Sequence, residues 1–153
     1  MPKLSEILLD PATKPAVVRD CVQLIDDEVR DKSGLSGLAV KGAFAVVKAL
    51  KPNMVEHQIT DLLPDFVEKL EPFWSEHQEK GAGRSLEDYV VSRKGEVADA
   101  LLSITDRRAQ RTTNTTIKKT YEKLRPTAKR NCEDAIPRLG RLVERYAKKH
   151  KAS

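Results

Sequence analysis

The chain has 153 residues, with 28 Lys and Arg against 23 Asp and Glu, so its formal net charge is +5. Charged residues make up 33% of the chain and aromatic residues 5%, which suits one soluble domain with an apolar core and excludes a large multidomain enzyme. Two cysteines exclude a disulfide scaffold and a cysteine-rich metal cluster.

The N-terminal sequence has no secretory signal, because Glu6 and Asp10 interrupt an apolar run that would need about 7–15 residues. The most apolar segment, residues 35–50, contains Lys41 and Lys48 and is too short to span a bilayer core of roughly 30 Å. We therefore expect a cytoplasmic protein with reduced thiols and no membrane contact.

Helical periodicity dominates the sequence, and strand alternation is nearly absent. Residues 1–12 form a short N-terminal segment, with one turn over residues 4–9. A helix follows from Thr13 to about residue 30. Its apolar stripe is Val18, Cys21, Val22, Ile25 and Val29.

The helix expected next, from residue 36 or 37 to about 51, is apolar around its whole circumference. This pattern is typical of the central helix of a bundle, so we place residues 38–50 near the centre. Gly42 and four alanines would let neighbouring helices approach closely. A ligand pocket beside Gly42 is the alternative interpretation.

From Pro52 to Phe73 the apolar spacing predicts an amphipathic helix, with kinks or restarts at Pro64 and Pro72. Residues 81–83 form a loop. Ser85 then caps a helix that reaches about Ile104, which is weakened by Gly95 in its middle.

The threonine-rich segment 112–116 predicts a break, because these side chains compete for backbone hydrogen bonds. A short helix then ends before Pro126, and a last helix carries an apolar seam from Ala128 to Tyr146. Residues 147–153 form a frayed basic tail. The sequence thus predicts an all-α fold, with residues 1–153 as a single compact bundle of about six or seven helices.

Motifs for catalysis and for phosphate, cofactor or metal binding are missing. The glycine-containing turn 81–85 leads into a helix and includes Arg84, but it lacks the strand and the spacing of a phosphate-binding loop. His57 and Asp61 share a helical spacing, but two ligands do not make a metal site. We therefore assign no catalytic, cofactor-binding or metal-ligating residue, and the balance is against an enzyme.

Charge is distributed unevenly, since residues 1–104 carry a net charge of −5 and residues 105–153 carry +10. Basic side chains beside hydroxyl groups and a helix start can hold phosphates, so this third of the chain is a candidate surface for nucleic acid or another polyanion. In the alternative interpretation it docks on the acidic part of the same chain. Tyr121 is the only aromatic residue between Tyr89 and Tyr146, so stacking platforms for single strands are lacking. The candidate contacts are Arg107, Arg108, Arg111, Lys118, Lys119, Arg125, Lys129 and Arg130.

Four segments together resemble a family of small, all-helical, cytosolic bacterial proteins of unknown function. They are Leu38–Phe44, Glu96–Leu102, Thr120–Pro126 and Ala135–Leu142. The resemblance implies an all-helical fold over most of the chain. The resemblance implies no activity and no site residue, so a standard enzyme is less expected.

The leading hypothesis is a non-enzymatic interaction or scaffold protein that binds another protein or a second copy of itself. The second is a nucleic-acid or polyanion binder that uses the basic region 107–130. The third is small-molecule binding or enzymatic activity in a helical pocket near Gly42 or loop 81–85.

Overall fold

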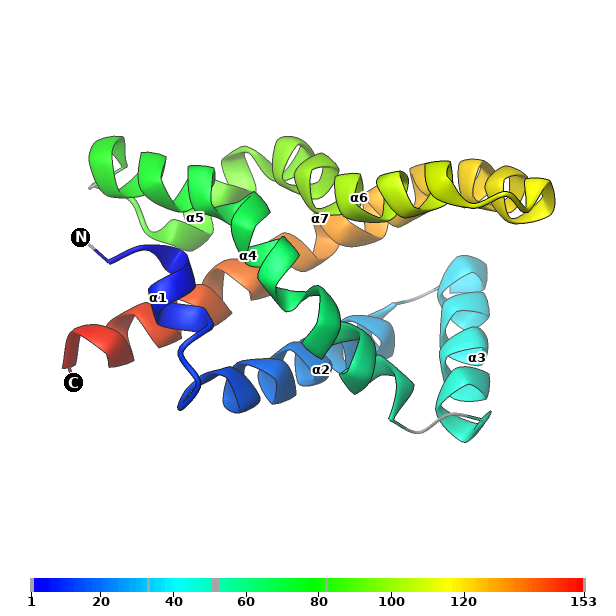
Figure 1. Ribbon diagram of the computed structural model, residues 1–153, viewed down its shortest axis with the longest axis horizontal. Coiled ribbons are helices and arrows are strands. Elements are labelled where there is room, and N and C mark those ends of the chain that lie inside the picture. The colour runs from blue at the N-terminus through cyan, green and yellow to red at the C-terminus, as the bar shows by residue number, and fades with distance from the viewer. Residues whose placement is uncertain (1, 33, 51–52, 82, 153) are drawn as a thin grey trace.

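The computed structural model describes residues 2–32, 34–50, 53–81 and 83–152. These residues form seven α-helices and no strand, which confirms the predicted all-α class and helix number (Figure 1). None of these helices is long and apolar enough to cross a membrane. The helices are α1 (Leu4–Leu8), α2 (Lys14–Asp31), α3 (Gly34–Leu50), α4 (Met54–Lys80), α5 (Leu86–Ser92), α6 (Lys94–Arg111) and α7 (Thr115–Ala152).

The core lies where α1, α2, α4, α5 and α6 meet the C-terminal part of α7. Val17 of α2, Val97 of α6 and Ile136 of α7 are completely buried in it. Burial of such side chains removes apolar surface from water, the main favourable contribution to folding. Helices from both ends of the sequence therefore form one core.

Two carboxylates cap the N-termini of short helices, where the first backbone N–H groups have no partner within the helix. Glu71 of α4 accepts hydrogen bonds from the backbone N–H of Leu4, at 2.7 Å, and of Ser5, at 3.2 Å. Glu144 of α7 accepts one from the N–H of Glu87 in α5 at 2.6 Å. Long-range capping thus fixes α1 on α4 and α5 on α7.

The predicted central position of residues 38–50 is wrong. Helix α3 forms as expected, but it lies at one edge of the molecule, where it contacts α2 and α4 (Figure 1). Leu38 and Leu50 are 66% and 76% exposed. An apolar sequence on all faces favours burial, yet none of the α3 side chains that the structure describes belongs to the buried core. The alanines at 39 and 43 lie outside the residues whose side chains are described.

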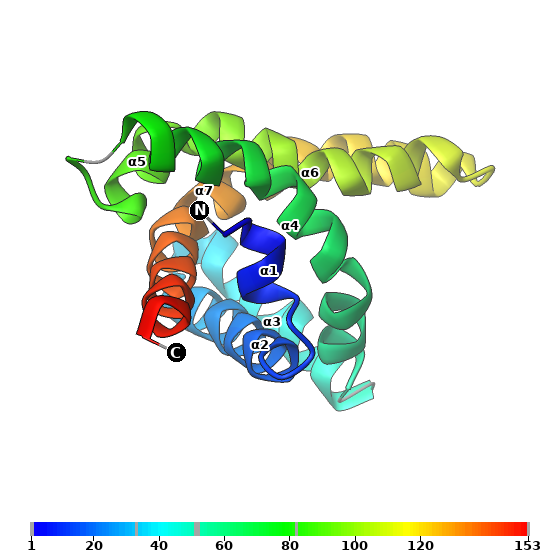
Figure 2. The ribbon, with the colours of Figure 1, turned by 60° about the vertical axis from the view of Figure 1, so that its left-hand side comes forward.

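The predicted helix end before Pro126 is also wrong, since α7 continues through Pro126 and Pro137 to Ala152. Ion pairs hold α7 to α6 on both sides of the first proline, from Arg125 to Asp106 at 2.9 Å and from Lys129 to Asp99 at 2.9 Å. These contacts offset the backbone hydrogen bond that a proline removes. Figure 2 shows that α7 changes direction along its length, as internal prolines permit.

Two other predicted boundaries differ in detail. Helix α4 does not restart at Pro64 or Pro72, but it bends along its length (Figure 1), in agreement with the predicted kinks. The helix expected from residue 86 is divided at Arg93 into α5 and α6. The Arg93 guanidinium donates to Glu76 at 2.6 Å and to Glu96 at 2.5 Å, so it ties the junction to α4.

Candidate functional site

Helices α6 and α7 form an antiparallel hairpin whose far end projects beyond the other helices (Figures 1 and 2). We call residues 107–124 the arm tip and residues 125–152 the packed part of α7. Between α6 and α7 the chain turns at Thr112–Asn114, where the Asn114 side chain accepts from the N–H of Thr116 at 3.0 Å and of Ile117 at 3.2 Å. The predicted break is therefore present but shorter, since α7 already begins at Thr115.

The arm tip brings together five of the eight predicted polyanion contacts. Arg107, Arg108 and Arg111 lie in the last turns of α6, and Lys118 and Lys119 lie in the first turn of α7. The three arginines and Lys119 are exposed, while Lys118 is half-buried. The arm tip contains six basic residues and one acidic residue, Glu122. It is therefore a positively charged end on a projecting hairpin.

Arg125 and Lys129 are already engaged within the chain. Arg125 donates to both oxygens of Asp106, at 2.9 and 3.1 Å, and Lys129 donates to Asp99 at 2.9 Å. The hydrogen bond from Arg125 lowers the pKa of Asp106, and the one from Lys129 lowers the pKa of Asp99. The Tyr121 hydroxyl also donates to Asp106, and burial is the main cause that raises the pKa of this tyrosine. These side chains join α6 to α7.

Further along α7, basic residues contact the acidic part of the chain. Arg138 pairs with Glu28 at 3.1 Å and also with Asp31, both in α2. Arg141 pairs with Glu87 of α5 at 2.6 Å. The interpretation that the basic third docks on the acidic part of the chain thus holds for its packed part, whereas the arm tip extends outward.

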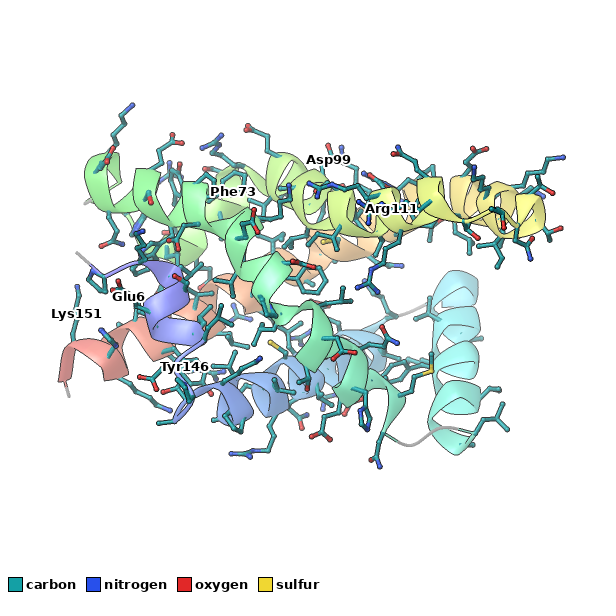
Figure 3. The ribbon with its side chains drawn as sticks, viewed as in Figure 1. Glu6, Phe73, Asp99, Arg111, Tyr146 and Lys151 are labelled. Carbon is teal, nitrogen blue, oxygen red and sulfur yellow. The ribbon has the colours of Figure 1, made fainter. Side chains whose placement is uncertain are left out.

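Tyr146 shows how closely the packed part of α7 is joined to α2. Its side chain lies between the C-terminal part of α7 and α2 (Figure 3), and its hydroxyl donates to Asp20. Burial is the first cause that raises the pKa of Tyr146, and the bond to Asp20 is the second. The tyrosine is therefore held in its neutral, donating form.

An exposed apolar surface on α3 is the feature that the sequence prediction missed. Leu38, Val46 and Leu50 are 66%, 57% and 76% exposed. Gly42, between them, is exposed too, and a Cβ added there would meet no atom within 4 Å. The signal in the sequence was the apolar composition of α3 on all faces and its lack of acidic residues, which the sequence analysis interpreted as a central position.

Two polar hollows flank the hairpin. One, of about 630 Å³, lies between α2, α3, α6 and α7 and includes Lys32, Lys94 and Arg130 among its lining residues. Acidic residues, among them Glu28 and Asp31, line it as well, so its charge is mixed. The other, of about 540 Å³, lies between α6 and α7 beside Tyr121. Arg130 thus lies beside the first hollow, away from the arm tip.

The remaining candidates from the sequence do not converge on a site. Neither Gly42 nor the described residues of loop 81–85 line these hollows. In the loop, Ser85 accepts from the N–H of Asp88 at 3.0 Å, as a helix cap, and Ala82 lies outside the described residues. Where the structure describes the chain, no group of three or more His, Cys, Asp or Glu side chains is placed to hold a metal ion.

A family model described as "Family of unknown function (DUF6918)" matches residues 4–147. This match confirms the resemblance to a family of unknown function. No curated protein matches the chain, and no solved structure does.

Proposed function

The chain belongs to the family of unknown function DUF6918, so we propose its function from its own surface. We propose that it is a non-enzymatic interaction protein that pairs with a second copy of itself through α3. The observation that carries this proposal is the exposure of large apolar side chains on α3, of which Leu38, Val46 and Leu50 are more than half exposed. Contiguous apolar surface of this kind is typical of protein interfaces.

The charge of α3 supports a second copy as the partner. A twofold interface places the same surface of both chains together, so like charges on it would repel. The 17 residues of α3 include no Asp or Glu, and its basic residues are Lys41 and Lys48. Lys41 is half-buried, whereas Leu38, Gly42 and Val46 are exposed. Leu38, Gly42 and Val46 carry no charge, so two copies of this face would meet without like-charge repulsion between these residues.

Analytical ultracentrifugation between about 1 and 100 µM tests the proposal, since a standard protein interface has affinity in or below this range. The wild type should dimerise, and Val46→Glu should be monomeric because it buries an unpaired carboxylate in the interface. The matched control is Ile117→Glu, which adds the same charge at a residue that is 54% exposed, against 57% for Val46. This control should dimerise like the wild type. A monomeric wild type, or a dimeric Val46→Glu variant, would contradict the proposal.

A second candidate function, polyanion binding, is favoured by the exposed arginines of the arm tip. Arg107, Arg108 and Arg111 are exposed in the arm tip, whose residues 107–124 include only one acidic residue. Duplex DNA, single-stranded RNA or polyphosphate should then bind with an affinity that falls steeply with salt, because binding releases counterions.

Fluorescence anisotropy at about 50 mM salt tests this second candidate. Reversing Arg107, Arg108 and Arg111 to Glu should abolish binding. Reversing Lys148, Lys149 and Lys151, which are exposed at the end of α7, changes the net charge equally and should reduce binding much less. Equal losses in both variants, or no binding by the wild type, would exclude a specific role of the arm tip.

A further inference from the structure

An apolar cavity of about 260 Å³, open on part of its surface, lies between the helices of the core. Its walls come from α1, α2, α4, α6 and α7. Protein interiors are close-packed and contain few voids larger than a water molecule. A hollow of this size between core helices is therefore unusual, and a concave apolar lining is the common form of a small-molecule binding site.

The lining offers no charge and no free polar group. Its residues are apolar apart from Thr105, Cys21 and Cys132. The Thr105 hydroxyl is already bonded to the carbonyl of Leu102 at 2.9 Å and to the Tyr121 hydroxyl at 2.8 Å. Burial raises the pKa of both thiols to about 11, so both are neutral at physiological pH. An ionised ligand group would be unpaired inside the cavity, at a high free-energy cost.

One part of the lining reaches solvent. Val17, Val67 and Ile136 are buried on the inner side of the cavity, whereas Leu24 and Phe66 are only half-buried although they are large and apolar. Side chains of this size are normally enclosed in a finished core. Eight other lining residues, from α2, α6 and α7, are half-buried as well, so a small molecule can reach the cavity from solvent.

We propose that this cavity is a binding site for an uncharged, apolar small molecule of about ten carbon atoms. The size follows by comparison with a dry apolar cavity of about 150 Å³, which holds benzene. The site is separate from the exposed face of α3 and from the arm tip. The proposed site can therefore be tested independently of both proposed functions.

Thermal unfolding with n-butylbenzene tests the proposal. A ligand that binds the folded state stabilises it, so the wild-type midpoint should rise in a saturable manner with one molecule bound per chain. Ala135→Leu fills the cavity and should remove the ligand-induced rise. Ala16→Leu is the matched control, because Ala16 is half-buried against the core but does not line the cavity, and it should retain the rise. No saturable rise in the wild type, or an equal rise in Ala135→Leu, would overturn the proposal.

Cysteine modification provides a second measurement that needs no variant. Cys21 and Cys132 both line the cavity, so n-butylbenzene at about ten times its Kd should slow their reaction with a thiol reagent about tenfold. The charge requirement is tested by comparing 1-decanol with decanoate at pH 8, where only the alcohol should protect the thiols. Equal protection by decanoate, or no protection by either neutral ligand, would refute the assignment.

Discussion

The arm tip and the packed part of α7 belong to one hairpin and are both strongly basic, but they use their charge in opposite ways. The arm tip contains six basic residues and one acidic residue, and the packed part contains nine and three. In the packed part, Arg125, Arg138 and Arg141 pair with carboxylates of α2, α5 and α6. In the arm tip, Arg107, Arg108 and Arg111 are exposed. Net charge alone therefore does not identify a binding surface.

Apolar side chains explain why only one of the two regions packs. In the packed part, Ile136, Leu142 and Tyr146 are buried, and they bring the neighbouring basic residues against acidic helices. In the arm tip, Ile117 and Leu124 are 54% and 58% exposed. The buried apolar side chains hold the packed part of α7 against the core, and its ion pairs form around these side chains.

The largest expected difference between the two regions is in core packing. Ile136→Ala should lower the free energy of unfolding by about 2–4 kcal/mol, because it removes a fully buried side chain. Ile117→Ala removes the same atoms from an exposed position on the same helix and should change stability by less than about 0.5 kcal/mol. Urea denaturation followed by circular dichroism measures both. Similar losses in the two variants would mean that the arm tip is packed as well.

The sequence predicts the fold class and the number of helices, because these depend on periodicity. Within the predicted seam of α7, Leu142 and Tyr146 are buried, but Ile136 and Val143, which are also buried, lie outside that seam. The helix break near residue 112 and the Ser85 cap are local signals and are also predicted correctly. The continuation of α7 through Pro126 is missed, because it depends on contacts from Arg125 and Lys129 to another helix. The outward position of α3 is missed for a related reason, since periodicity cannot tell whether the other helices of the chain cover an apolar face.

In the candidate site too, features that depend on nearby residues are predicted from the sequence, and contacts between distant residues are not. Sequence reasoning identifies the exposed arginines at 107, 108 and 111, because they cluster along the chain. It also selects Arg125 and Lys129, which the structure pairs with Asp106 and Asp99. Their carboxylate partners are 19 and 30 residues away in sequence, and no spacing rule connects residues across a hairpin.

A smaller effect is expected at the ion pairs where the arm begins. Asp106→Asn removes a carboxylate that accepts from Arg125 and Tyr121. Its side chain is 30% exposed, so the loss should be about 1 kcal/mol, below the full value for a buried charged hydrogen bond. Glu122→Gln changes an exposed charge in the arm tip and should have little effect. Denaturation with urea compares the two, and equal losses would show that the Asp106 cluster does not hold the arm.

The pH dependence of that difference provides a finer test. The folded-state pKa values of Asp99 and Asp106 are lowered, chiefly by hydrogen bonds from Lys129 and Arg125. The two carboxylates therefore contribute their full stabilisation above their unfolded-state pKa of about 3.9. This stabilisation is lost as the pH falls through their lowered folded-state pKa values. The difference in stability between the wild type and Asp106→Asn should be constant from about pH 5 to 8 and shrink below about pH 4. Urea denaturation in a series of buffers measures it, and a difference that grows in acid would contradict the assignment.

The smallest effect on stability is expected at the exposed arginines of the arm tip. Replacing Arg107, Arg108 and Arg111 by Gln keeps three long side chains that form helices well, so the free energy of unfolding should change by less than about 0.5 kcal/mol. Replacing Arg125 by Gln leaves Asp106 without its charged partner and should lower stability more, although it changes one charge instead of three. If the triple variant is the less stable of the two, the arm-tip arginines take part in folding, and their exposure is no longer an argument for a binding role.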